Sequence, residues 1–155
     1  MLKLRVFIFL IVGFLLSYLK IPGKTFNFSM LPGIFMALYI SRKEGALVNG
    51  LVYFMTGIYA LFPQSLVARI VIGIGAFLGT YIMGIEKAKI KFLSMGIVVA
   101  SMISFGVVSY VYKSNGLVAG TILSNWIICG LIAFVMGHVV DMPNQKGVIA
   151  KWLKS

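Results

Sequence analysis

Arg69 is the residue of this sequence whose chemistry most needs an explanation, because it stands at the start of an apolar stretch that continues through Gly73, Gly75 and Gly79. A guanidinium within a bilayer costs about 2.5–3.5 kcal/mol at mid-depth and less near the interface. Arg69 therefore needs water, a buried partner or an anionic ligand. Its planar fork suits a carboxylate or another planar anion. The alternative is that its side chain extends to the outer headgroups.

Other polar and aromatic residues are predicted to gather at the level of Arg69. The candidate solute-binding set is Arg69, Asn125, Trp126, Tyr59, Phe62, Gln64, Asn27, Phe28 and Tyr110. Asn125 offers a donor and an acceptor, and the aromatic rings would stack on a flat solute. Because buried polar groups must be paired or face a cavity, the set predicts a mostly apolar pocket with a few polar groups. The alternatives are an interfacial aromatic belt and, for Asn125, a hydrogen bond to another helix.

The sequence carries no signature of an enzyme. Cys129 is its single cysteine and His138 its single histidine, so neither a metal cluster nor a nucleophilic triad can be assembled. The three acidic residues lie outside the apolar segments, which argues against a carboxylate proton relay. A Walker A motif is also missing. We therefore expect no cofactor, and any uphill transport would depend on a partner.

The composition indicates an integral membrane protein with a single domain, residues 1–155. Hydrophobic residues make up 61% of the chain and the mean hydropathy is +1.05, whereas soluble domains are nearer 45–50% apolar. The net charge of +11 would suggest nucleic acid in a soluble protein. Here the basic residues lie between apolar segments, so we expect them to set the orientation in the lipid membrane rather than to bind nucleic acid.

Six apolar segments predict an all-α bundle of six transmembrane helices. The expected helices are residues 3–19, 28–40, 45–62, 66–85, 90–112 and 117–140, followed by an amphipathic cytoplasmic tail, residues 141–155. The second segment is short and contains Pro32. Its 13 residues rise only about 20 Å as a helix, against a hydrocarbon core of roughly 30 Å. It is therefore expected to be tilted, broken or extended.

The basic residues predict that both termini are cytoplasmic. With six spans, one side of the membrane receives ten of the 14 basic residues: Lys3, Arg5, Arg42, Lys43, Lys87, Lys89, Lys91, Lys146, Lys151 and Lys154. The positive-inside rule assigns this side to the cytoplasm.

Two pairs of small residues have the spacing that lets helix backbones approach closely in lipid. Gly75 and Gly79 are expected to pack helices within the bundle. Gly13 and Ser17 suit either packing within the bundle or docking on a partner.

Three stretches carry a resemblance to a known family: Lys20-Ile21-Pro22, Phe26–Gly33, and Lys43–Tyr53 with Phe62-Pro63. They resemble the substrate-binding S components of energy-coupling factor (ECF) vitamin transporters, with the third stretch closest to the biotin-type branch. The longer Gly/Pro-rich connection that usually follows the third helix in that branch is missing.

The resemblance implies a six-helix subunit in the cell membrane of a prokaryote, multi-pass, with both termini cytoplasmic. Such a subunit binds a vitamin or similar nutrient in its outer half, under the loop between helices 1 and 2. It docks on a scaffold membrane subunit that is powered by two ATPase subunits. The family's small-residue docking motif on helix 1 is matched by Gly13 and Ser17.

Two functions follow as expectations. The first is a high-affinity substrate-capture subunit of an ECF-type importer for an anionic or aromatic nutrient. The alternative is a small structural or scaffolding membrane protein of the cell-shape morphogenesis type, with no small-molecule ligand. A holin-like pore would need a continuous polar helix face, and none of the six segments shows one.

Overall fold

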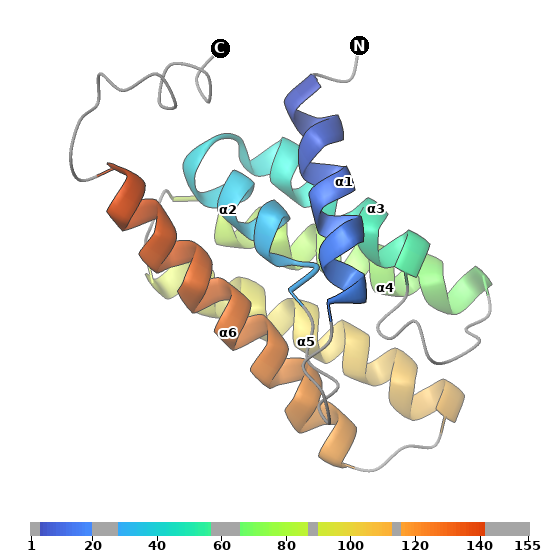
Figure 1. The fold of residues 1–155 in the computed structure, drawn as a ribbon. Helices are drawn as coiled ribbons and strands as arrows, with labels where there is room; N and C mark the ends of the chain where they lie inside the picture. Colours follow the sequence, from blue (N-terminus) through green and yellow to red (C-terminus); the bar gives the residue numbers. More distant parts are fainter. Residues whose placement is uncertain (1–3, 20–27, 57–65, 87–89, 113–115, 142–155) are drawn as a thin grey trace.

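The computed structural model describes residues 4–19, 28–56, 66–86, 90–112 and 116–141, and this part of the chain is all-helical (Figure 1). The six helices are α1 (Leu4–Tyr18), α2 (Leu31–Tyr39), α3 (Arg42–Thr56), α4 (Leu66–Met83), α5 (Ile90–Tyr112) and α6 (Gly116–Asp141). The predicted all-α class is confirmed for the described residues.

Three of the described helices are long and apolar enough to cross a membrane by length and composition. Their spanning windows are Leu66–Met83, Ile90–Val107 and Gly120–Gly137, and α1 is a shorter apolar helix. These windows support a membrane helical bundle, whereas six complete spans remain a prediction.

The helix boundaries differ most from expectation in α2 and α3. The second helix begins at Leu31 rather than 28, because Pro32 fixes the backbone of its first turn. It ends at Tyr39, where Ile40 N and Ser41 N both donate to the carbonyl of Met36, at 2.9 and 2.8 Å. The third begins at Arg42 rather than 45, and its predicted end at 62 lies outside the described residues. The fourth ends at Met83 instead of 85, and the remaining described ends agree within about two residues, as helix ends commonly do.

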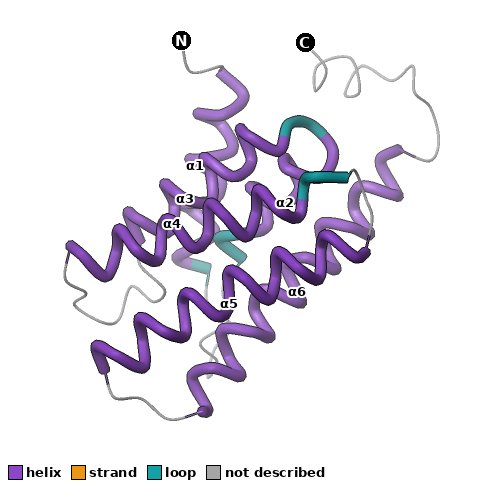
Figure 2. Tube along the Cα trace, turned by 180° about the vertical axis from the view of Figure 1, so that it is seen from behind, coloured by secondary structure: helices purple, strands orange, loops and turns teal. Residues whose placement is uncertain are grey.

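Helix α2 lies in the middle of the bundle. It packs against α1, α3, α4 and α6, while α5 packs between α4 and α6 (Figure 2). Ile34 and Leu38 belong to the larger apolar core, which α2 to α6 build together. Met36 belongs to a smaller core with Val6, Val48 and Val52. With nine residues, α2 extends only about 14 Å, so its role is to fill the bundle rather than to cross it alone.

Small residues bring α4 and α5 into close contact. A Cβ atom added at Gly79 would lie 2.5 Å from Ala100 Cβ and 2.7 Å from the carbonyl oxygen of Gly96. One at Gly75 would lie 2.5 Å from Ile103 Cγ2. The interpretation of Gly75 and Gly79 as helix-packing residues is confirmed.

Charged and aromatic contacts gather where α1 and α3 begin and where α4 and α6 end. Arg5 Nε donates to Glu44 Oε2 at 2.7 Å, which joins the first turns of α1 and α3. Arg42 Cζ lies 4.8 Å from the centroid of the Tyr81 ring near the end of α4. Tyr39 Oη donates to the carbonyl of Phe134 on α6 at 2.9 Å. These contacts place the four helix ends at one end of the bundle, called here the Arg5 end.

Candidate functional site

Trp126 and Tyr53 form a stacked pair inside the larger core. Their ring centroids are 5.7 Å apart and the rings are inclined by 27°. Trp126 is 0% exposed and Tyr53 is 3% exposed. Phe28 packs against the same core, and Asn125 beside Trp126 is also buried. Three of the predicted site residues are therefore gathered at or next to one core.

Tyr53 was not among the site residues predicted from the sequence. A signal was available, because Tyr53 follows Asn49 by four residues on α3 and therefore shares its helix face. The structure buries both side chains.

Buried polar atoms from α5 and α6 lie near the level of the stacked pair. Within the described part of the chain, Trp126 Nε1, Ser101 Oγ and Ser104 Oγ are buried and have no hydrogen-bond partner. Gly130 of α6 packs against Ile97 of α5, at 3.2 Å from an added Cβ. These neighbouring helices are antiparallel. Trp126 lies four residues before Gly130 on α6, and Ser101 lies four residues after Ile97 on α5, so the two residues lie at the same level of the bundle. Ser104 then lies about 4.5 Å further from the Arg5 end.

The indole N–H, which belongs to the aromatic stack, and the two hydroxyls therefore lie at adjacent levels of the bundle. The N–H is a donor only, and each hydroxyl can donate and accept. Such a set can hold a small, flat molecule through its polar edge while the rings contact its face.

Arg69 is half-buried on α4 and reaches the last turn of α3. Its Nη1 lies 3.5 Å from the carbonyl oxygen of Met55, which is a long hydrogen bond. The end of a helix carries partial negative charge, so this position suits a cation. Nε of Arg69 is buried and has no hydrogen-bond partner among the described residues. The hydrogen bond that Arg69 forms thus joins α4 to α3 and does not reach Trp126.

Tyr110, a further predicted solute-binding residue, is not brought to this core. Tyr110 is 89% exposed, so its side chain lies on the surface of α5. Four members of the predicted set fall outside the described residues: Asn27, Tyr59, Phe62 and Gln64.

Gly13 and Ser17, the predicted docking pair, are both buried. A Cβ atom at Gly13 would lie 2.9 Å from Val52 Cγ2 and 3.1 Å from the carbonyl oxygen of Ser29. Ser17 Oγ donates to the carbonyl of Phe14 at 2.6 Å. As placed here, the pair packs α1 within the bundle and does not present a surface to a second protein.

A second polar contact joins α3 to α4 nearer the Arg5 end. Asn49 Nδ2 donates to Thr80 Oγ1 at 2.9 Å, and both side chains are fully buried. The carboxamide of Asn49 lies against Gly33 of α2, where a side chain would not fit. Asn49 is therefore a packing contact between α2, α3 and α4.

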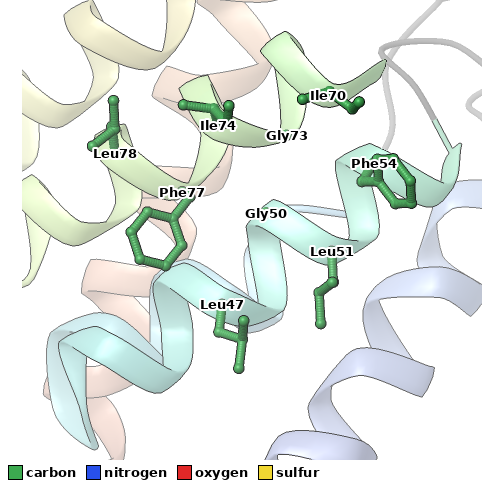
Figure 3. A pocket seen from close by; sticks show the side chains of 9 residues that line it. All are labelled: Leu47, Gly50, Leu51, Phe54, Ile70, Gly73, Ile74, Phe77 and Leu78. Atoms are coloured by element: carbon green, nitrogen blue, oxygen red, sulfur yellow. The ribbon is translucent and has the colours of Figure 1, made fainter. Parts of the chain in front are cut away.

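An apolar groove of about 290 Å³ lies between α3 and α4 (Figure 3). Gly50 and Gly73 form its floor, and leucine, isoleucine and phenylalanine side chains form its walls. None of the described members of the predicted site lines it, because it lies on a different face of α4 from the stacked pair's core.

No cluster of three His, Cys, Asp or Glu side chains that could hold a metal occurs in the described ranges. Comparison of the chain with protein-family models, with curated proteins and with solved structures gave no match. The function is therefore inferred from the chain's own residues.

Proposed function

We propose that this chain is the substrate-capture subunit of an ECF-type importer, which binds a flat, vitamin-like solute in the outer half of the bundle. The observation that carries the proposal is a set of two buried donors without a described hydrogen-bond partner: Trp126 Nε1, which belongs to the stack with Tyr53, and Ser104 Oγ, at a neighbouring level of α5. The resemblance of three sequence stretches to ECF S components is the second line of support.

The physical reason for expecting a solute is the free-energy cost of burying polar groups without hydrogen-bond partners. A buried polar group with no hydrogen bond costs about 1–3 kcal/mol, and hydrocarbon offers no water to compensate. A solute with acceptor atoms on one edge would satisfy both donors, and its ring would contact Tyr53 and Trp126. This arrangement follows the usual composition of small-molecule sites, in which apolar walls carry a few placed polar groups.

Arg69 gives the proposed solute a second anchoring point. Ile72 belongs to the same core as Trp126, and Arg69 precedes Ile72 by three residues, so its backbone lies about 4.5 Å further from the Arg5 end. A solute with a ring in the stack and a carboxylate at its other end would reach toward this guanidinium. We therefore propose an anionic solute with an aromatic part.

Transport in this proposal depends on partners. The sequence contains no nucleotide-binding motif, so a scaffold membrane subunit and two ATPase subunits would supply the energy. Because Gly13 and Ser17 are buried, a scaffold would have to contact the chain on another surface or after α1 has moved.

The test is native mass spectrometry of the full chain released from its membrane, followed by identification of any small molecule it carries. Ser104→Ala removes one hydroxyl, and Trp126→Phe removes the indole N–H while keeping a ring. Both variants should retain less of the molecule. Ser94→Ala is the matched control, because Ser94 is exposed and donates to the carbonyl of Lys91 in its own helix.

The outcome also decides between the two functions. A small molecule that is retained by the parent chain and by Ser94→Ala, and lost from Ser104→Ala, supports solute capture. A parent chain that carries no small molecule and binds no candidate vitamin would leave the structural membrane protein as the better reading.

A further inference from the structure

Besides its apolar walls, the groove between α3 and α4 has a cation at one end, to which two aromatic rings connect it. Phe77 lines the groove and stacks on Tyr81, with ring centroids 6.2 Å apart and planes inclined by 10°. Arg42 Cζ then lies 4.8 Å from the centroid of Tyr81. The groove therefore leads along α4 to an arginine at the Arg5 end.

The positive charge at this end of the groove is not neutralised by the nearest acid of the same helix. Arg42 and Lys43 are both exposed in the first turn of α3. Glu44 is engaged by Arg5, whose Nε and Nη2 donate to its two carboxylate oxygens at 2.7 and 3.1 Å. Two exposed cations thus stand where the apolar groove ends, and they are complementary to a phosphate group.

The length of the surface corresponds to one leaflet of a bilayer. From Ile70 to Tyr81 the groove and the adjoining Tyr81 ring together cover twelve residues of α4, a rise of about 16 Å. Half of the hydrocarbon core is about 15 Å. A partner helix that crosses the membrane would be expected to follow α4 along its whole length, whereas one acyl chain would cover this distance.

We propose that this groove is a binding site for an anionic phospholipid of the cytoplasmic leaflet. One acyl chain lies over Gly50 and Gly73, and the phosphate contacts Arg42 and Lys43. The proposal is independent of the solute-capture function, since it uses a different face of α4 and none of the residues assigned to the solute.

The test uses the full chain in detergent with two lipids of identical palmitoyl and oleoyl chains, phosphatidylglycerol and phosphatidylcholine. Native mass spectrometry measures how much of each lipid is retained. The parent chain should retain more phosphatidylglycerol. Lys43→Gln should lower its retention about five-fold, because a basic residue near an anionic headgroup contributes about 1 kcal/mol. Lys91→Gln is the matched control, since Lys91 is also an exposed lysine in the first turn of a helix and should leave retention unchanged.

A second arm tests the chain-binding part of the groove. Ile74 is 52% exposed on α4, and Ile74→Trp should fill the groove and lower the retention of both lipids. Val98→Trp is its control, because Val98 is 48% exposed on α5. Three results would overturn the proposal: equal retention of the two lipids by the parent chain, equal loss in Lys43→Gln and Lys91→Gln, or unchanged lipid retention in Ile74→Trp. If Ile74→Trp instead abolished a dimer of the chain and left lipid retention intact, the groove would hold a second copy.

Discussion

The role of the Arg69 side chain depends on which groups lie within reach of its guanidinium. Its position after Ser65 and Leu66 predicts a cation near the outer interface, but not which group it meets. In the structure it reaches the carbonyl of Met55 in the last turn of α3. The contact is long, and Nε is buried with no partner among the described residues. The guanidinium therefore retains donors for a ligand.

Arg69→Gln should weaken binding of an anionic solute by about 1.5–3 kcal/mol, the contribution of a hydrogen bond to a charged group. Titration of the purified chain with the solute identified by mass spectrometry would measure this loss. If Arg69 serves only the end of α3, the variant would instead lose about 0.3–1 kcal/mol of stability and keep its affinity. That second result would remove Arg69 from the binding site.

At the level of the helices, the long apolar segments were the easiest part to predict. Helices α5 and α6 lie within about one residue of their expected bounds at the described ends, because their length and hydropathy leave little choice. Helix α2 is shorter than predicted because Pro32 and the turn at Ile40 and Ser41 limit it to nine residues.

The orientation of each helix could not be predicted in the same way. Lipid tails are as apolar as a protein core. The sequence of α1 therefore has no polar face that would distinguish its outward side from its buried side. Its buried residues are Val6, Gly13 and Ser17, and only the packing against α2 and α3 reveals this. The same reason applies to the site: the sequence left Trp126 open between an interfacial belt and a buried site, and it gave no sign that Tyr53 would stack on Trp126.

The contact between α4 and α5 gives a prediction at this scale. Gly79→Val should destabilise the bundle by about 1–3 kcal/mol, the usual cost of overpacking, because an added Cβ would meet Ala100 and the backbone of Gly96. Gly106→Ala is the control, since an added Cβ there has no described neighbour within 4 Å. It should be neutral or stabilising by up to about 1 kcal/mol. Unfolding in mixed micelles would measure both, and equal destabilisation of the two variants would contradict the packing.

For the whole molecule, the contacts at the Arg5 end constrain the path of the chain even though α2 is too short to span. The Arg5–Glu44 ion pair joins the starts of α1 and α3. An added Cβ at Gly84, just after α4, would lie 2.6 Å from the Cβ of Arg42. Tyr39 at the end of α2 is bonded to Phe134 near the end of α6. Whatever the depth of α2, these five helix ends lie at one end of the bundle.

The excess of basic residues predicts that this end faces the cytoplasm, and cysteine labelling would test the prediction. In a Cys129→Ala background, Lys43→Cys should react with a membrane-impermeant maleimide only after the cells are permeabilised. Tyr110→Cys should react in intact cells, because Tyr110 is 89% exposed and lies 20 residues along α5 from Ile90, or about 30 Å. That rise equals the thickness of the hydrocarbon core. If α5 crosses the membrane, the Lys43→Cys and Tyr110→Cys variants must therefore be labelled from opposite sides. Labelling of Lys43→Cys in intact cells would reverse the orientation, and with it the leaflet proposed for the phospholipid and the side from which a solute would enter.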